Sequence, residues 1–576
     1  MPDRRDPDPF PSPAPGAAEP RRGITRGFLR GALAAVALAL APAAGAAPAL
    51  SPLDLDFAIV AQFRPFDLLP RPFVQVSERF TQGAAPRAVA ACAGGPAERL
   101  ADAGAALRLR PAGDAPLLVR SGERPAAPFA TAIVTVPADG AVEGAILAGL
   151  VRDGRHHVTA SFDRGRNAAA GTVAIDVTVD GRRTRAASAT ADLAGIERFA
   201  FAVNENYVTA LVERAGAWVP VVQHRVTALV DLRDPAVLSA YRYGFGAAGA
   251  AIDVAAFEAG HFGEAGLRDP HVVSYADGTP YIRGNKLYFT ATQAGLSFFQ
   301  AAHWGVWTLD LDDPSRIEPV AKLFFRRDGL LLGDHAGQIV VDERGGGFHV
   351  AVSSWGDFAF KGVHVRYRRT TADILSGVHV LESARLPLPT DVSAWDPAMV
   401  RIAGRWFVGF VESPYQDPAR GFDFHPALAR SGRGAPPTRL GRVGADRSRG
   451  ETEGVILQRI GGRWYLLASD GDDRRYRVYD LAMRPLGSLK APYGTNIPHP
   501  QVVPVTREGR TSYLLITFNG TQYHEPVLGY GTHGDVIVMR ARQTSPVPEF
   551  APRAGGREPA RPVPATGERA LCLEAP

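Results

Sequence analysis

Short apolar runs separated by glycine, proline and Asp-Gly signals fill the chain from about residue 50 to residue 258. Segments with the period of an α-helix are scarce there. The runs have the length and the β-branched and aromatic content of strands. The clearest are residues 56–60, 130–136, 157–162, 172–179 and 199–203. Asp180-Gly181 is a two-residue hairpin signal between two of them. The pattern predicts an antiparallel β-sandwich over residues 47–261.

A repeat replaces this pattern from residue 262 onward. Each unit has a polar opening residue, a short apolar strand, a turn and a second, strongly β-prone run. The five opening residues are separated by 65, 62, 57 and 46 positions: Asp269, Asp334, Asp396, Glu453 and His499. Repeats of about 40 to 60 residues with several strands each are typical of β-propellers. We therefore predict an all-β chain in which a five-bladed β-propeller over residues 262–542 follows the sandwich.

The propeller prediction brings distant residues together. The innermost strand of each blade lines the central channel, so the five opening residues are expected to converge on one funnel. Three of them are carboxylic acids, at positions 269, 396 and 453.

The two ends of the chain have compositions of their own. Residues 1–46 resemble an export signal: Arg21-Arg22 and Arg26 precede an apolar run that ends in a small-residue cleavage site, Ala44-Gly45-Ala46. The arginines suggest a twin-arginine route, and an uncleaved anchor is the alternative. We expect a secreted, extracellular or periplasmic protein that leaves the membrane after cleavage. Residues 543–576 are proline-rich and are predicted to be a tail or an extended strap.

Composition excludes some functions. The chain has 576 residues, 46% of them hydrophobic and 21% charged, as expected for a large globular protein. Its net charge of +5 is not gathered into a basic face, so nucleic acid is not an expected partner. We expect a monomer. Cys92 and Cys572 could form one disulfide or remain two free thiols, and neither indicates a metal site.

Three carboxyl groups in one funnel suggest a reaction. Hydrolysis of a glycosidic bond needs one carboxylic acid to protonate the leaving oxygen and one carboxylate to activate water or to attack carbon. Crowded like charges raise the pKa of at least one carboxyl group, which keeps it protonated near neutral pH. Asp269, Asp396 and Glu453 are therefore candidate catalytic residues. Glu451, two positions before Glu453 and on the same face of a strand, is an alternative acid.

The motifs resemble a known family. Arg268-Asp269-Pro270, Trp395-Asp396-Pro397, Thr452-Glu453-Gly454 and His499, in this order, are similar to glycoside hydrolase family 43. The resemblance implies Asp269 as general base, Asp396 as the orienting and pKa-tuning carboxylate, and Glu453 as general acid. It also implies inversion at the anomeric carbon and arabinofuranosides, xylosides or related polysaccharides and oligosaccharides as substrates. His499 matches the family's axial histidine, which implies one Ca²⁺, another cation or a water on the axis near it, and no other cofactor. The strand pattern and Gly244-Phe245-Gly246 before Ala251-Ile252-Asp253-Val254 resemble a jelly roll of the concanavalin or laminin-G type.

Further side chains are candidates for contacts with the substrate. Flat aromatic rings in a polar funnel suit stacking on a sugar, and polar side chains suit its hydroxyl groups. The candidates for substrate binding are His271, Asp334, Trp355, Trp395 and Glu412, with Asn519 and His524 as additional hydroxyl contacts. Asp334 could equally be a turn residue. Trp406 and Trp464 recur in the same Gly-Arg-Trp position and are explained by blade packing.

Two other functions remain open. One keeps the propeller but makes Asp269 a nucleophile with retention, as in the fructan-cleaving relatives of family 32. The Trp-Met-Asn and Glu-Cys motifs of those relatives are absent here. The other is a non-catalytic propeller that binds glycan or protein. The chain departs from family 43 at Val455, where proline is common, and in placing its sandwich before the propeller.

Overall fold

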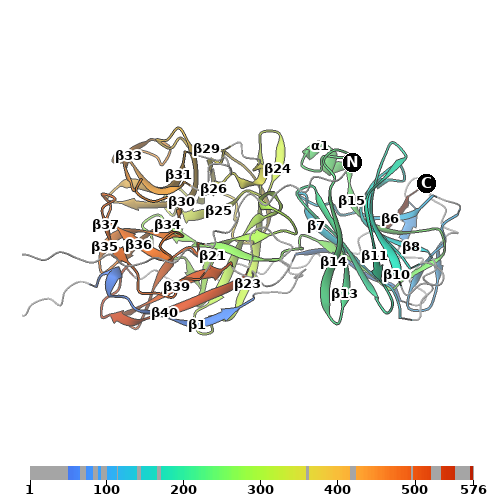
Figure 1. Cartoon of the computed structure of the whole chain (residues 1–576), viewed down its shortest axis with the longest axis horizontal. Helices are drawn as coiled ribbons and strands as arrows, with labels where there is room; N and C mark the ends of the chain where they lie inside the picture. Colours follow the sequence, from blue (N-terminus) through green and yellow to red (C-terminus); the bar gives the residue numbers. More distant parts are fainter. Residues whose placement is uncertain are drawn as a thin grey trace, which may run out of the picture.

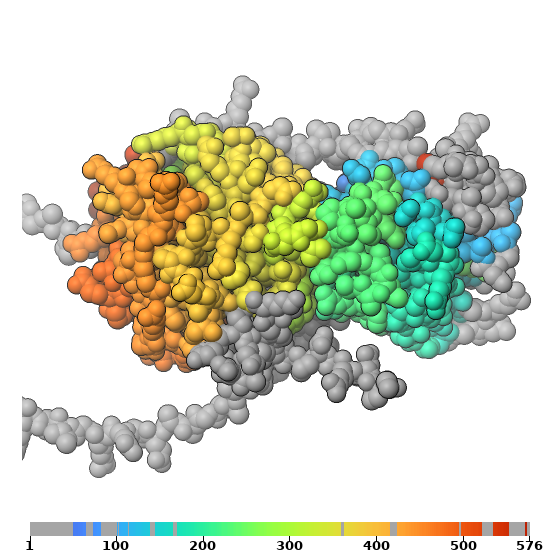
Figure 2. Space-filling model, turned by 90° about the horizontal axis from the view of Figure 1, so that it is seen from above, coloured from blue at the N-terminus to red at the C-terminus, as the bar shows by residue number. Residues whose placement is uncertain are grey.

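The computed structural model describes most of the chain between residue 50 and residue 574. The described ranges are 50–64, 73–81, 89–91, 100–112, 115–138, 144–164, 170–358, 362–414, 423–494, 497–520, 534–551 and 571–574. β-Strands are the main secondary structure of these residues, and the one α-helix among them is α1 (Pro235–Ala240). No helix of the described ranges is long and apolar enough to cross a membrane. Figures 1 and 2 show two β-structures side by side along the long axis, a sandwich in cyan and green and a propeller in yellow to red.

The sandwich consists of two large sheets that face each other. The first has the order β11 (Arg182–Asp192), β10 (Ala170–Val179), β9 (His156–Asp163), β8 (Ala145–Asp153), β15 (Arg242–Ala248), β6 (Leu117–Ser121), β41 (Leu571–Glu574), β3 (Val89–Ala91). The second has the order β14 (Ala217–Arg225), β13 (Tyr207–Arg214), β12 (Arg198–Asn204), β7 (Phe129–Thr135), β17 (Ala256–Gly260), β2 (Val74–Arg79). A small third sheet contains β16 (Ile252–Val254), β5 (Leu107–Leu109) and β4 (Leu100–Asp102).

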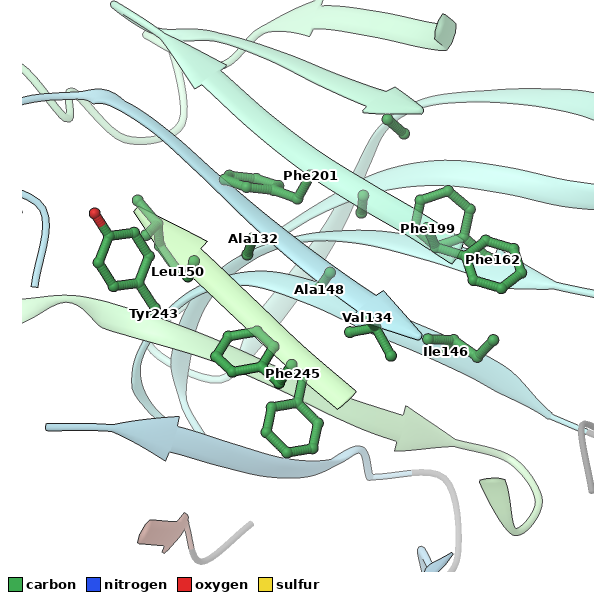
Figure 3. Close-up of a cluster of buried hydrophobic side chains, with 14 of the residues drawn as sticks. Ala132, Val134, Ile146, Ala148, Leu150, Phe162, Phe199, Phe201, Tyr243 and Phe245 are labelled. Atoms are coloured by element: carbon green, nitrogen blue, oxygen red, sulfur yellow. The ribbon is translucent and has the colours of Figure 1, made fainter. Parts of the chain in front are cut away.

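Alternate residues of the strands fill the space between the two sheets. Figure 3 shows Phe199 of β12 beside Phe162 of β9, with ring centroids 4.7 Å apart. The predicted hairpin is present, because Asp180 and Gly181 both have positive φ between β10 and β11. In the second sheet, the residues that point away from the first sheet are buried as well. Ile133 and Ala200 on this outer face pack against Phe262 and Leu296. A sheet covered on both faces explains why its strands are almost continuously apolar.

The propeller has the five predicted blades, each built around a meander of strands whose first member lies innermost. Blade one contains β18 (Gly266–Val272), β21 (Lys286–Ala294), β22 (His303–Asp310) and β23 (Ile317–Arg327), with β20 (Ile282–Arg283), β24 (Leu330–Leu332) and β28 (Gly377–Glu382) at its edges. Blade two contains β25 (His335–Val341), β26 (Phe348–Ser353), β27 (Val365–Thr370) and β29 (Ala384–Arg385), with β19 (Ser274–Tyr275) beside β25.

The other three blades have four strands each. Blade three contains β30 (Ser393–Ile402), β31 (Arg405–Ser413), β32 (His425–Ser431) and β33 (Leu440–Ala445). Blade four contains β34 (Thr452–Ile460), β35 (Arg463–Asp470), β36 (Arg475–Tyr479) and β37 (Pro485–Ser488). Blade five contains β38 (Gln501–Arg507), β39 (Arg510–Asn519), β40 (Asp535–Ser545) and β1 (Phe57–Phe63).

The two ends of the described chain correct the predicted boundaries. The sequence pattern predicts residues 57–63 in the sandwich, but they form β1, which pairs antiparallel with β40 as the outermost strand of blade five. It predicts residues 571–574 in a tail, but they form β41, which lies between β6 and β3 in the sandwich. Both pairings join segments about 450 or more positions apart in sequence, a relation that local patterns cannot reveal. The chain therefore begins its described part in the propeller and ends it in the sandwich.

The sandwich and blade one share a buried junction. The rings of Phe129 in β7 and Phe324 in β23 stack with centroids 5.4 Å apart. Beside them, Lys322 of β23 pairs with Glu264, and both side chains are at most 2% exposed. The Lys322 ammonium also donates to Gln293 Oε1 at 2.6 Å. The two structures are thus joined by packed rings and an internal ion pair.

Candidate active site

The inner strands of four blades carry the same local distortion. One extra residue interrupts the pairing of β18, β25, β30 and β34 with the next strand of its blade. At each interruption one residue has positive φ: Asp269 at 52°, Ala336 at 54°, Asp396 at 50° and Gly454 at 65°. Such bulges redirect side chains and are common beside active sites. Positive φ is rare for residues other than glycine, although aspartate tolerates it better than most.

Hydrogen bonds between neighbouring blades hold these bulges. Ala336 N donates to Thr292 Oγ1 at 3.1 Å, and Asp396 N donates to Ser353 Oγ at 3.0 Å. Gly454 N donates to Asp396 Oδ2 at 2.9 Å, which links blades three and four through a candidate catalytic carboxyl group. The backbone N–H groups released from the strand pairing are thereby satisfied.

The structure brings Asp269, Asp396 and His499 together at the axis. His499 Nε2 lies 3.5 Å from Asp269 Oδ1 and 3.5 Å from Asp396 Oδ2, so both carboxyl groups meet the same imidazole edge. A Cβ on Gly454 would come within 2.4 Å of His499 Cδ2. Glycine at 454 therefore allows both the positive φ and the close approach of the histidine.

Glu453 joins this group from blade four. It directly precedes Gly454 and accepts a hydrogen bond from Trp395 Nε1 at 3.0 Å. The site thus contains three carboxyl groups from blades one, three and four, as the sequence predicts. The backbone of the nearby Glu451 forms an isolated parallel β-bridge with Phe424. The Glu451 carboxyl group interacts electrostatically with Asp472 and Asp470.

Burial and neighbouring charges shift the pKa values of the three carboxyl groups in different directions. Burial alone would raise the pKa of Asp269, but the electrostatic interactions with His499 and Arg268, together with a hydrogen bond from Thr292, outweigh it and lower the pKa below its usual value. The pKa of His499 itself falls to about 4 because the ring is buried, so the ring is neutral near pH 7. Arg268, with Nε 3.7 Å from Asp269 Oδ1, is then the cation that keeps Asp269 ionised.

The other two carboxyl groups shift in the opposite direction. Burial raises the pKa of Glu453 to about 7, and the negative charge of Asp269 raises it further. The positive charge of Arg268 and the hydrogen bond from the Trp395 indole lower it, but they do not cancel the effect of burial. Burial, then the charges of Glu453 and Asp269, raise the pKa of Asp396 well above its usual value. One ionised carboxylate and one acid that is still partly protonated at pH 7 are what acid–base catalysis at neutral pH requires.

An aromatic cluster covers the site on the side of blades two and three. The Trp395 ring is only 4% exposed and lies between Trp355 and Phe424, each with ring centroids 5.5 Å away. Trp355 is half-buried and stacks on His335 at 6.4 Å. Trp395 therefore supports Glu453 through its indole N–H, and Trp355 is the more accessible of the two rings. Their contact with a sugar stays a prediction.

The remaining predicted contacts differ in their surroundings. His271 lies just past the bulge of β18, and its Nε2 has no hydrogen-bond partner among the described residues. Burial lowers the pKa of His271 to about 3, so its ring is neutral. Asn519 is the last residue of β39, and His524 lies outside the described residues.

Asp334 does not occupy the place that the repeat assigned to it. The residue at the bulge of blade two is Ala336, two positions later. Both Asp334 oxygens accept from Arg327, at 2.6 and 2.7 Å, and the carboxylate is fully buried. Arg327 also pairs with Asp357. Asp334 is thus engaged in an internal ion pair, which corrects its expected contact with sugar hydroxyl groups.

Glu412 is also held by other protein groups. Its oxygens accept from Arg442 Nη1 at 2.7 Å and Nη2 at 2.5 Å, and His425 Nε2 lies 3.3 Å away. Burial opposes ionisation, but the hydrogen bonds from His425 and Arg442 prevail and lower the pKa of Glu412 to about 2. Glu412 lines a cavity on blade three rather than the axis.

Among the described residues, few oxygen atoms of the kind that bind Ca²⁺ lie near His499. Ca²⁺ takes about six to eight oxygen ligands, whereas His499 has two carboxyl groups at 3.5 Å. The described residues contain no group of three or more His, Cys, Asp or Glu side chains that could hold a metal ion. Axial calcium stays a prediction. Cys572 is in a disulfide, and Cys92, the only other cysteine, lies outside the described residues.

Two site residues received no role from the sequence. Arg268 and His335 immediately precede bulge residues, in the same register as Trp395 and Glu453. Arg268 is 7% exposed, and its guanidinium also lies over the ring of Phe518 at 4.9 Å. Aligning the repeats on the residue before each bulge would have identified both.

The chain matches no protein-family model and no curated protein. Among solved structures it is similar to a levansucrase of Bacillus subtilis, with 9% identity, a TM-score of 0.36, and 50% of this chain and 89% of that one covered. A thermostable family-43 glycoside hydrolase has 11% identity, a TM-score of 0.32 and coverages of 50% and 97%. The GH43_1 enzyme from Xanthomonas citri has 15% identity, a TM-score of 0.31 and coverages of 48% and 87%. Similarities with such low identities and TM-scores do not establish the chemistry of this chain.

Proposed function

We propose that this chain is a glycoside hydrolase that cleaves arabinofuranoside or xyloside bonds with inversion. The observation that carries the proposal is the opposite shift of two carboxyl groups in one site: the pKa of Asp269 is lowered, and that of Glu453 is raised to about 7. A single-displacement hydrolase needs this division between a base and an acid. Export through residues 1–46, which lie outside the described residues, is part of the proposal.

In the proposed mechanism Asp269 takes a proton from a water molecule as the water oxygen attacks the anomeric carbon. Glu453 gives its proton to the leaving glycosidic oxygen, so that bond breaks as the new one forms. The two carboxyl groups then exchange one proton through solvent and return to their starting states. Asp396 positions Glu453 because its Oδ2 accepts from Gly454 N, the residue next to the acid. Arg268 keeps Asp269 ionised throughout.

The proposal is tested by replacing each group with its neutral isostere. Asp269→Asn and Glu453→Gln are each expected to lower kcat/KM on aryl arabinofuranosides and aryl xylosides by about 10²- to 10⁴-fold. Asn tolerates the positive φ at position 269, so thermal unfolding near neutral pH is expected to change little. Full activity in either variant would eliminate the assigned role. No turnover of any aryl glycoside by the unmodified chain would eliminate the proposed function.

A further inference from the structure

A short connection in blade one borders the candidate active site. Residues 295–302, called the wall segment below, join β21 to β22 and contain the 3₁₀-helix η3 (Phe299–Ala301). The equivalent connection of blade two, after β26, contains the 3₁₀-helix η4 (Trp355–Asp357). The end of β21 pairs with the start of β18, and the end of β26 pairs with the start of β25. Both connections therefore lie on the side of the propeller where the bulges of the inner strands are found.

Ring contacts connect the wall segment to the candidate acid. The centroid of the Phe299 ring lies 5.2 Å from that of Trp355. The Trp355 ring lies 5.5 Å from the ring of Trp395, whose indole N–H donates to Glu453. Phe299 and Trp355 are both half-buried, so part of each ring is open to solvent. A partly accessible aromatic surface is thus joined to the acid by direct contacts.

The backbone of Phe299 is tied to the side of the candidate base. Its carbonyl oxygen accepts a hydrogen bond from His335 Nε2 at 3.1 Å. His335 directly precedes the bulge of blade two and interacts electrostatically with Asp269. The wall segment is therefore in contact with neighbours of both the base and the acid. In the proposed mechanism the sugar to be cleaved must lie between these two groups.

The sandwich holds the start of the wall segment at Leu296. Leu296 N donates to Asn204 Oδ1 at 3.2 Å, and Leu296 O accepts a hydrogen bond from Gln223 Nε2. The Leu296 side chain is fully buried in the cluster on the outer face of the second sheet. A Cβ at Gly295 would collide with Ala301 O and lie 2.9 Å from Asn204 Cβ, so the segment passes close to the sandwich. Both backbone groups and the side chain of Leu296 are thus fixed by the other β-structure.

We propose that Asn204 and Gln223 of the sandwich are positioning residues for the substrate: they hold the wall segment so that the Phe299 ring, beside Trp355, contacts the apolar face of the sugar. This inference rests on the proposed function and deepens it, because it makes the sandwich part of the substrate site. Ligand sites are lined mainly by apolar and aromatic side chains, as here. A segment that is fixed before the substrate arrives loses little conformational entropy when the substrate binds.

The anchor is tested first in the full-length chain without substrate. Gln223→Met nearly keeps the length of the side chain and removes the donor to Leu296 O. Hydrogen–deuterium exchange over residues 295–302 is expected to become about fivefold faster, because the segment opens more easily. The matched control is Gln75→Met, which removes a hydrogen bond from Tyr243 that stays within the sandwich and should leave this exchange unchanged. Unchanged exchange in Gln223→Met would overturn the inference.

Kinetics on aryl arabinofuranosides and aryl xylosides test the contact with the sugar. Gln223→Met and Phe299→Ala are each expected to raise KM by about three- to tenfold with kcat nearly unchanged, because the wall segment binds substrate and transition state alike. A loss of overall structure would lower kcat as well. The controls Gln75→Met and Phe550→Ala, the second of which removes a half-buried ring from Trp464 of blade four, should keep the original KM.

The outcomes separate this inference from the proposed function. Turnover with an unchanged KM in both Gln223→Met and Phe299→Ala would overturn the inference and leave the glycosidase intact. No turnover of any aryl glycoside by the unmodified chain would remove the proposed function and, with it, the substrate contact of Phe299. A raised KM in both variants but in neither control supports the positioning role of the sandwich.

Discussion

At the scale of single residues, the site depends on two aspartates held in an uncommon backbone conformation. Asp269 and Asp396 have φ of 52° and 50° at equivalent bulges of blades one and three. The N–H and carboxyl groups of Asp396 are tied to blades two and four, and the Asp269 carboxyl group meets His499, which precedes blade five. The distortion is thus accompanied by contacts that only the closed ring provides. Backbone strain of this kind is usually found at functional sites.

Glu453 should make the folded protein less stable as the pH rises. Its pKa is about 7 when folded and 4.5 ordinarily, so the folded state keeps a proton that the unfolded chain has lost. The associated stability is fully present below about pH 4.5 and is lost as the pH passes through 7. Glu453→Gln should therefore raise Tm by a few degrees at pH 8 relative to the unmodified chain, with little change at pH 4.5. Scanning calorimetry at both pH values checks this, and a lower Tm at pH 8 would contradict it.

Trp395 should tune the acid through its indole N–H. The bond to Glu453 Oε2 favours the ionised carboxylate and so lowers the pKa of Glu453. Trp395→Phe removes the donor, and the alkaline limb of the kcat/KM profile should move to higher pH by about half a unit or more. Trp464→Phe, at the far end of a hairpin in blade four, is the matched control and should leave the profile unchanged. A shift to lower pH in Trp395→Phe would contradict the assignment.

At the scale of elements, β1 closes the propeller although it comes from the start of the described chain. It pairs with β40, and Phe57 is buried in a cluster with residues of blades four and five. Ile59 in the same strand is 45% exposed. Closure by a strand from the opposite end of the chain secures the first and last blades against separation.

The closing strand yields a stability prediction. Phe57→Ala should destabilise the propeller by about 3 to 5 kcal/mol, the usual loss for a buried phenylalanine. Ile59→Ala in the same strand should change the free energy of unfolding by less than about 0.5 kcal/mol, as exposed positions do. Chemical denaturation followed by tryptophan fluorescence measures both. Equal effects of the two substitutions would mean that β1 does not close blade five.

The sequence predicts the structure of local segments, but it does not predict contacts between segments that are far apart in the chain. The strands of the sandwich, the Asp180-Gly181 hairpin and the order of the five blades follow from patterns within a few tens of residues. Asp269, Asp396 and Glu453 were found because each opens a repeat. Blade two was misaligned because its bulge residue is an alanine, which gives no chemical signal. The pairings of β1 and β41, and the engagement of Asp334 by Arg327, depend on contacts that only the folded chain forms.

At the scale of the whole molecule, the two β-structures are interlocked. The chain passes from the propeller at β1 to the sandwich at β2, back to the propeller at β18, and again to the sandwich at β41. At the junction Lys322 and Glu264 form a buried ion pair beside the stacked rings of Phe129 and Phe324. We expect the two structures to unfold in one cooperative transition.

The junction pair tests this coupling. Lys322→Met leaves the Glu264 carboxylate buried without its partner and should cost about 3 to 5 kcal/mol. The double variant Lys322→Met/Glu264→Gln should recover most of that loss. Lys286→Met, which breaks a partly exposed pair with Glu318, should cost less than about 1 kcal/mol. Calorimetry should show a single peak in every variant, displaced furthest in Lys322→Met, and two separate peaks would contradict the coupling.

The division of roles between Asp269 and Glu453 is tested most directly by the configuration of the first product. Proton NMR spectra recorded in the first minutes of hydrolysis of an aryl arabinofuranoside or xyloside show which anomer is released before mutarotation. A base that activates water at Asp269 predicts the anomer opposite to that of the substrate. Release of the same anomer would make Asp269 a nucleophile and contradict the account.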